Sequence, residues 1–264
     1  MDYIYETHLH TWEASACALM PGAEYIEYMK NKGYSGMIVT DHFYNGNSII
    51  PRDMPWEQWI ERYCRGYENA KKAAEGTDFA VLFGVEYNFQ GDEYLLYGID
   101  KEWLLARPEM LKYTRKQLYD EVTKAGGLMI HAHPYRERHY ISAIHLSPET
   151  CDGIEVYNAA NEPYQNALAR EYGEKYGLSV IAGSDIHYRH DKAMGGVRLS
   201  RPLSDIQDFI HAYRQGELEP VSIRPDGKVM TLGQLPKECV PEQRQTLPVK
   251  FHRLMDKTEG GETT

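Results

Sequence analysis

Histidine and acidic side chains recur in this chain in short motifs, and imidazole and carboxylate groups are common protein ligands of zinc, manganese and iron. A carboxylate such as Glu86 can bridge two cations about 3.5–4 Å apart, the spacing of two-metal hydrolytic sites. The set therefore predicts a site with at least two ions. The motifs are Thr7-His8-Leu9-His10-Thr11, Thr40-Asp41-His42, Gly84-Val85-Glu86, Ile130-His131-Ala132-His133-Pro134 and Gly183-Ser184-Asp185-Ile186-His187.

Each motif is expected where a β-strand ends. Short runs rich in β-branched and aromatic residues alternate with stretches of helical period. The predicted strands cover residues 3–6, 36–40, 79–85, 127–130, 153–157 and 178–182, with a further strand or hairpin over 93–99. The predicted helices cover residues 21–32, 55–75, 114–125, 161–176 and 204–216. This alternation predicts a parallel α/β sheet, either closed as a distorted barrel or open and doubly wound.

The strand ends are expected to bring the motifs together. Parallel strands place their C-terminal ends on one face, where barrel enzymes and open α/β enzymes build their sites. Side chains two residues apart in extended backbone point the same way. We therefore expect paired contributions from His8 with His10, from His131 with His133, and from Asp185 with His187.

Composition limits the class of protein. With 264 residues, 42% of them hydrophobic, the chain can bury one large core. Its four cysteines form no Cys-x-x-Cys pair, and the first six residues lack the profile of a secretory signal, so we expect a soluble cytoplasmic protein without a membrane segment. The formal net charge of −10 disfavours binding to a nucleic-acid backbone but allows a small anionic substrate. Residues 1–225 are predicted to form the catalytic domain, and residues 226–264 a C-terminal extension that packs on it or trails from it.

In order and spacing, the motifs resemble the PHP (polymerase and histidinol phosphatase) superfamily over about residues 1–200. The resemblance implies a distorted (β/α)7 TIM-like barrel with two or three divalent transition metal ions (Zn, Mn or Fe) at the C-terminal strand ends. It also implies hydrolysis of phosphoester bonds. The first metal would be held by His8, His10 and Asp185, with Glu86 bridging it to a second metal at His133. The ligands of a third metal are matched by His42 and His187.

The chain departs from the family pattern in two places. Many members carry an Asp or His ligand a few residues after the His-x-His, where this chain has Ala14-Ser15-Ala16 and only Glu13 stands nearby as a substitute. The third ligand set is therefore incomplete. Many members also carry a His on the strand after the bridging Glu, where this chain offers Tyr94. We expect His131 to compensate at the second metal.

The expected reaction is attack of a metal-bridging water on phosphorus, with the cations neutralising the non-bridging oxygens. Arg136 follows His133 by three residues and is expected to bind a substrate phosphate through its planar guanidinium, the alternative being a surface arginine. The candidate proton donors to the leaving oxygen are His187 and Asp41.

Three functions remain open at this point. The first is a phosphatase, similar to histidinol phosphatase, that acts on a small phosphorylated substrate. The second is an exonuclease-type phosphodiesterase, against which the acidic charge balance argues. The third is a non-catalytic module whose metals serve folding. Neither the substrate nor an oligomeric state is predicted.

Overall fold

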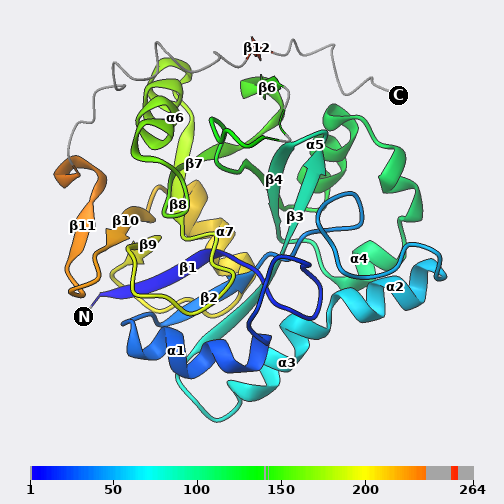
Figure 1. Ribbon diagram of the computed structural model, residues 1–264, viewed down its shortest axis with the longest axis horizontal. Coiled ribbons are helices and arrows are strands. Elements are labelled where there is room, and N and C mark those ends of the chain that lie inside the picture. Colours follow the sequence, from blue (N-terminus) through cyan, green and yellow to red (C-terminus); the bar gives the residue numbers. More distant parts are fainter. Residues whose placement is uncertain (1, 140, 142, 236–250, 255–264) are drawn as a thin grey trace.

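A curled sheet forms the centre of the protein in the computed structural model, which describes residues 2–139, 141, 143–235 and 251–254 (Figure 1). Its ten strands lie in the order β11-β10-β9-β1-β2-β3-β4-β5-β7-β8. Their bounds are β1 (Tyr3–Leu9), β2 (Gly36–Val39), β3 (Ala80–Phe89), β4 (Asp92–Tyr97), β5 (Leu128–His131), β7 (Gly153–Asn158), β8 (Ser179–Gly183), β9 (Met194–Leu199), β10 (Glu219–Ile223) and β11 (Val229–Thr231).

The sheet curls until the chain leaving β8 meets the end of β1. Beyond β8, Ile186 pairs in parallel with Leu9. The Ile186 amide donates to the His8 carbonyl at 3.2 Å, and the His10 amide donates to the Ile186 carbonyl at 2.9 Å. The result is a half-barrel, which agrees with the expected α/β class and is compatible with a distorted barrel.

The sheet is not a regular series of seven parallel units. Strand β4 runs antiparallel to both β3 and β5, and β9 runs antiparallel to both β1 and β10. The β3–β4 reversal follows from the two-residue turn at Gln90 and Gly91, whose φ angles of 54° and 105° are the left-handed values of a tight hairpin.

Helices cover the outside of the sheet. Contacts join α1 to β2, α3 to β3, α5 to β5 and α6 to β7 (Figure 1). The helix predicted over 55–75 is divided at Cys64 into α2 and α3. The bounds are α1 (Tyr25–Asn31), α2 (Trp56–Tyr63), α3 (Arg65–Ala73), α4 (Lys101–Leu105), α5 (Arg115–Lys124), α6 (Pro163–Tyr176) and α7 (Ile206–Arg214), with 3-10 turns at Gly22–Glu24, Pro108–Lys112, Pro148–Thr150 and Leu232–Gln234.

An aromatic cluster positions the loop that follows β2. The Phe43 ring meets the rings of Trp59 and Tyr63 edge-on, each at 5.1 Å between centroids. The Tyr63 hydroxyl also donates to the Asp41 carbonyl at 2.7 Å. These side chains are at most 2% exposed, so burial of aromatic surface fixes the backbone on both sides of His42.

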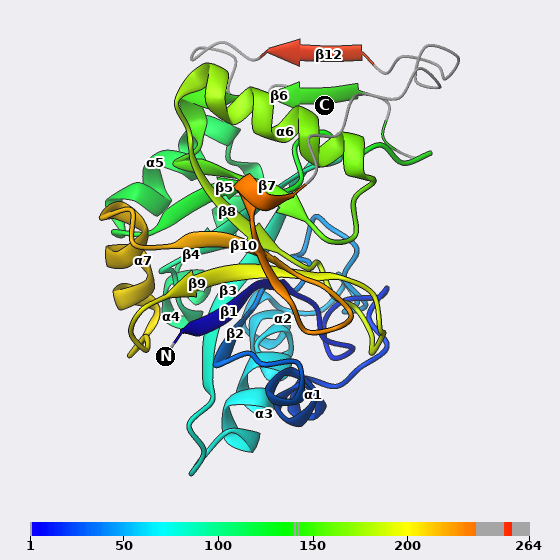
Figure 2. The same cartoon turned by 90° about the vertical axis from the view of Figure 1, so that its left-hand side faces the viewer.

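Two strands of the expected C-terminal extension pack on the rest of the chain. Strand β11 pairs with β10. Strand β12 (Phe251–Leu254) pairs in parallel with β6 (Ala143–Leu146), as Figure 2 shows. The boundary at residue 225 stays a prediction, and residues 236–250 and 255–264 of the extension lie outside the described residues.

Within the described part of the chain, no helix combines the length and the apolar character needed to cross a bilayer.

Candidate metal centre

Side chains from five strand ends converge on one buried cluster. Four groups of three residues each bring ligand atoms within 4.8 Å of one another. The groups are His8, His10 and Asp185; His8, Glu86 and His133; His10, His42 and His187; and His42, Glu86 and Glu93. The structure thus brings together seven of the eight residues expected as metal ligands; the exception is His131.

Glu86 lies between four imidazoles. Its Oε1 is 3.1 Å from His8 Nε2 and 3.3 Å from His133 Nε2. Its Oε2 is 2.5 Å from His42 Nδ1 and 3.6 Å from His10 Nε2. Because each oxygen faces a different pair of imidazoles, this carboxylate can serve two ions at once.

Asp185 completes the first group, which it forms with His8 and His10 at the end of β1. Its Oδ1 lies 3.0 Å from His10 Nε2 and 3.4 Å from His8 Nε2. The residue has a φ of 54°, a left-handed conformation that is uncommon outside glycine and is tolerated best by Asp and Asn. The unusual backbone therefore directs the carboxylate at the two histidines.

Several polar atoms of the cluster are buried without a hydrogen-bond partner, namely His8 Nε2, His10 Nε2, His42 Nδ1 and Glu86 Oε2. The short contact between His42 and Glu86 lacks hydrogen-bond geometry. Buried polar atoms are nearly always paired, so four orphans in one cluster indicate a missing partner. Imidazole and carboxylate donors at this spacing fit divalent transition metal ions.

The electrostatics favour the ligand forms of these groups. Burial alone would raise the pKa of Glu86, but its histidine neighbours, His42 foremost, hold that pKa well below its usual range. Burial likewise opposes ionisation of Asp185, and Arg136 outweighs it, so the pKa of Asp185 is also well below normal. Burial, together with two neighbouring imidazoles, lowers the pKa of His10 and keeps its ring neutral.

A second carboxylate orients His8. Glu155 Oε1 lies 3.0 Å from His8 Nδ1, while its Oε2 accepts from the His133 amide at 3.0 Å and from Asn158 Nδ2 at 2.8 Å. Carboxylates in this position commonly fix the tautomer and ring orientation of metal-binding histidines. Glu155 therefore leaves His8 Nε2 free to face Glu86 and Asp185.

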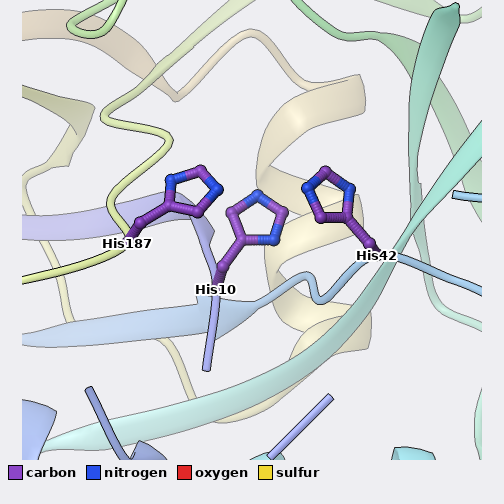
Figure 3. A group of neighbouring side chains, drawn as sticks. All are labelled: His10, His42 and His187. Carbon is purple, nitrogen blue, oxygen red and sulfur yellow. The ribbon is translucent and has the colours of Figure 1, made fainter. Parts of the chain in front are cut away.

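We call His10, His42 and His187 the third group. Figure 3 shows His10 between His187 and His42. The His10 ring centroid is 4.3 Å from each of the other two. His187 Nδ1 bonds the Asp185 carbonyl at 2.8 Å. Glu13, expected as a substitute ligand, does not join this group, because its carboxylate accepts from the Gly22 amide and from Asn69 Nδ2, each at 3.0 Å.

Cys17, which the sequence does not single out as a ligand, lies in a loop that bonds to the His187 carbonyl through the Leu19 amide. Burial would raise the pKa of its thiol, but hydrogen bonds with His187 and His42 lower it to about 6. The signal missed in the sequence is its place in the loop after the first His-x-His.

His131 lies in none of the four groups. Its ring stacks on Tyr94, with centroids 4.6 Å apart. The expected pairing with His133 assumed continuous extended backbone, but β5 ends at His131, and His133 has a φ of 30°. The alternation of side chains along an extended strand is therefore interrupted between His131 and His133. The arrangement gives no support to His131 as a ligand.

Asp41 faces the loop after β1. Its Oδ1 accepts from the Thr11 amide at 2.6 Å and from Ser15 Oγ at 2.7 Å, and its Oδ2 accepts from Thr11 Oγ1 at 2.6 Å. Ser15 Oγ in turn lies 3.2 Å from His10 Nδ1. These contacts link Asp41 to His10 through Ser15, and its expected role as proton donor stays a prediction.

Arg136 is turned toward a ligand of the cluster. Its guanidinium donates to Asp185 Oδ2, and further to Asn161 Oδ1 at 2.9 Å and Asn158 Oδ1 at 2.8 Å. The side chain is 10% exposed, which corrects the alternative of a surface arginine. The expected contact with a substrate phosphate stays a prediction, since this guanidinium is engaged with Asp185.

Glu93 is a further candidate ligand that the sequence reasoning missed. Its Oε2 is 3.5 Å from His133 Nε2, and its Oε1 is 3.6 Å from His42 Nδ1. Glu93 is the second residue of the antiparallel strand β4, opposite Asn88 near the end of β3. In a hairpin the second strand begins beside the end of the first. The strand or hairpin expected over residues 93–99 was therefore the sequence signal that could have placed Glu93 at the site.

Comparison with known proteins gives a partial family match and a shared fold. The PHP_C family, described as PHP-associated, matches residues 163–218. A two-domain protein from Bacteroides vulgatus, containing a predicted PHP-like metal-dependent phosphoesterase, is 16% identical with a TM-score of 0.56 over 83% of this chain. This chain spans 64% of the length of that protein.

Two further solved structures share the fold. PsfC from Pseudomonas syringae is 16% identical with a TM-score of 0.52, over 79% of this chain and 88% of that one. A candidate metal-dependent phosphoesterase from Bifidobacterium adolescentis is 16% identical with a TM-score of 0.50, over 70% of this chain and 87% of that one. No curated protein matches the chain in sequence.

Proposed function

On the premise that the chain belongs to the PHP superfamily, which the PHP_C match and the PHP-like fold support, we propose that it is a metal-dependent phosphoesterase acting on a small phosphate monoester. The observation that carries the proposal is the position of Glu86 between two pairs of imidazoles. Divalent ions bound there would lower the pKa of water and neutralise phosphate charge.

The chain's own residues supply a rigid frame for such ions. Glu155 orients His8, and Ser15, held by Asp41, contacts His10. Ligands fixed in this way do not need to reorganise when an ion or a substrate binds, which is the usual benefit of supporting hydrogen bonds around a metal site.

Access to the cluster is expected from the side of His187, Glu93 and His42, whose side chains are the most exposed of the cluster. The side chains of His8, His10 and Glu86 are fully buried, whereas that of His187 is 20% exposed and that of His42 is 10% exposed. A substrate phosphate would therefore approach beside His187 and His42. A proton for the leaving oxygen would come from His187, the more exposed of the two.

The charge balance favours a small substrate over a nucleic acid. The chain carries 39 acidic and 29 basic residues, so a polyanion would meet net repulsion, whereas a single phosphate can be neutralised locally by bound cations.

The test is a screen of protein reconstituted with Mn²⁺, Zn²⁺ or Fe²⁺ against phosphate monoesters, phosphodiesters and single-stranded oligonucleotides. We expect turnover of monoesters that is lost in Glu86→Ala and kept in Arg201→Ala, whose arginine pairs with Asp208 and Glu217 at the surface. Turnover confined to oligonucleotides would establish the exonuclease alternative. Bound metal without turnover of any ester would establish the non-catalytic module.

A further inference from the structure

A cavity of about 750 Å³ lies outside the metal centre, between α6 and the hairpin of β10 and β11. Figure 1 shows these elements on one side of the molecule. The lining includes Asn158 at the end of β7, Asn161 before α6, Arg170 on α6 and Arg224 after β10. None of the lining residues belongs to the four ligand groups. We call this space the α6 cavity, and its volume is in the range of sites for small organic ligands.

Three asparagines of the α6 cavity are satisfied by hydrogen bonds within the protein. Asn166 Oδ1 accepts from the Asn158 amide at 3.1 Å and from Asn161 Nδ2 at 3.2 Å. Asn166 Nδ2 donates to the Asn158 carbonyl at 3.0 Å. The side-chain oxygens of Asn158 and Asn161 both accept from Arg136. These contacts fix this wall of the cavity without the help of a ligand.

Arg170 lines the same cavity and lacks such a partner. Its Nε is buried and makes no hydrogen bond. Among the described residues, no ion pair joins its guanidinium to a carboxylate. Arginine stays protonated in proteins, and buried donors are nearly always paired. The guanidinium therefore needs an acceptor that this part of the chain does not supply.

The charge around Arg170 favours an anion as that acceptor. Arg224 adds a second guanidinium to the lining, and its pairing with Asp226 at 3.4 Å joins two side chains that are more than half exposed. Surface ion pairs of this kind contribute little. Glu171 and Glu174 also line the cavity, but both are exposed, where solvent and salt screen their charge. The positive charge at the buried Nε of Arg170 is therefore left uncompensated.

The lining also offers apolar surface. Pro163 and Ala167 contribute it from α6, and Met230 and Leu235 from β11 and the segment that follows. Ligand sites commonly combine an apolar lining with a small number of polar groups that fix the orientation of the ligand. A molecule with one anionic group and an apolar body would fit both parts of this lining.

We propose that the α6 cavity binds a small organic anion, a phosphate or a carboxylate, through the guanidinium of Arg170. The lining includes no candidate metal ligand, so this binding requires no metal and goes beyond the proposed function. Asn158 and Asn161 line the cavity and also hold Arg136, which donates to Asp185. The bound anion would thus lie next to the residues that support the first group of metal ligands.

Calorimetric titration of metal-free, full-length protein tests the site without turnover. The probes are phenyl phosphate, benzoate and the neutral benzyl alcohol. We expect saturable binding of at least one of the two anions, the tighter one identifying the anionic group, and much weaker binding of the alcohol. Arg170→Ala should weaken anion binding about tenfold, because a charge-assisted hydrogen bond is lost. Arg170→Lys should recover part of the affinity, since it keeps the charge but loses the planar fork.

Two control variants separate this site from the metal centre and from surface charge. Arg201→Ala removes a surface arginine that pairs with Asp208 and Glu217, and His187→Ala alters the metal centre; both should keep wild-type affinity for the anion. Equal affinity in wild-type protein and Arg170→Ala, equal binding of anions and alcohol, or a loss in His187→Ala alone would overturn the proposal. Binding that depends on Arg170 in a protein that hydrolyses no phosphoester would refute the proposed function alone.

Discussion

Arg136 donates a hydrogen bond to Asp185 Oδ2, while the other oxygen of that carboxylate faces His8 and His10. A guanidinium expected to bind substrate is thus bound to a candidate metal ligand. Such a contact holds the carboxylate in place and keeps it ionised, because burial would otherwise favour its protonated form.

Replacing Arg136 should therefore weaken metal binding. Removal of a hydrogen-bonded neighbour of a metal ligand typically costs about 10–100-fold in affinity. We expect Arg136→Ala to lower the affinity of the first site by that factor and Arg136→Lys to recover part of it, as measured by competition with a metal indicator. Arg201→Ala, which removes a surface ion-paired arginine, is the control. If Arg136→Ala kept the wild-type affinity for metal but had a lowered kcat/KM, Arg136 would contact the substrate and not support the metal site.

Glu86→Ala should remove two ions together. Its two oxygens face separate pairs of imidazoles, so its loss removes a carboxylate oxygen from both sites. His42→Ala should release mainly the ion of the third group, and elemental analysis of both purified variants gives the comparison. Equal losses in the two variants would show that Glu86 does not bridge.

Much of this centre could be predicted because strand ends carry positional information. His8, His10 and Glu86 stand on or next to strands, where alternation and parallel pairing decide which side chains meet. The structure departs from the expected arrangement where the backbone leaves the strand conformation. The φ of 30° takes His133 out of the strand conformation, so His131 and His133 are not paired as expected. Nothing in the His-Ala-His-Pro sequence predicts that angle.

The two residues that were missed are placed by a hairpin in one case and by long-range contacts in the other. Glu93 reaches the site because a tight hairpin reverses the chain, and Cys17 because its loop bonds to two distant loops. Such contacts join segments up to about 170 residues apart, as between Leu19 and His187, and they depend on tertiary packing that local sequence patterns do not encode.

Metal removal should lower thermal stability. The metal-free cluster keeps buried carboxylates and imidazoles together with orphaned atoms, and an ion at about 100 times its Kd would add about 2.7 kcal/mol. For a chain of this size that corresponds to a fall in Tm of about 5–10 °C on chelation. Calorimetry with and without EDTA measures it, and Glu86→Ala should show a smaller shift. An unchanged Tm in wild-type protein of verified metal content would contradict the stabilising role.

We expect Glu93, and not His131, to contribute to metal binding. His131→Phe preserves the stacking on Tyr94 and should keep the full number of ions. Glu93→Gln removes a carboxylate close to both His42 and His133 and should weaken binding of the ion between them. Metal titrations of the two variants decide the matter, and a lost ion in His131→Phe would restore the expectation from the sequence.

The last prediction concerns the leaving group of the substrate. Of the five exposed large hydrophobic side chains in the described residues, four lie in loops next to the third group: Trp12, Leu19, Ile49 and Tyr188. The Leu19 amide bonds the His187 carbonyl, and the Ile49 amide bonds the Ala14 carbonyl, so these loops border the accessible side of the cluster. Exposed apolar side chains gathered in one place indicate a binding surface.

We therefore expect aryl phosphates to be better substrates than phosphates of small polyols. Trp12→Ala and Tyr188→Ala should each lower kcat/KM for an aryl phosphate about fivefold, equivalent to about 1 kcal/mol of aromatic contact, with little change for glycerol phosphate. Tyr176→Ala removes the fifth exposed side chain, on α6, and is the matched control. Equal losses on both substrates would mean that these side chains support the loops, because a contact with the leaving group must distinguish an aromatic alcohol from a polar one.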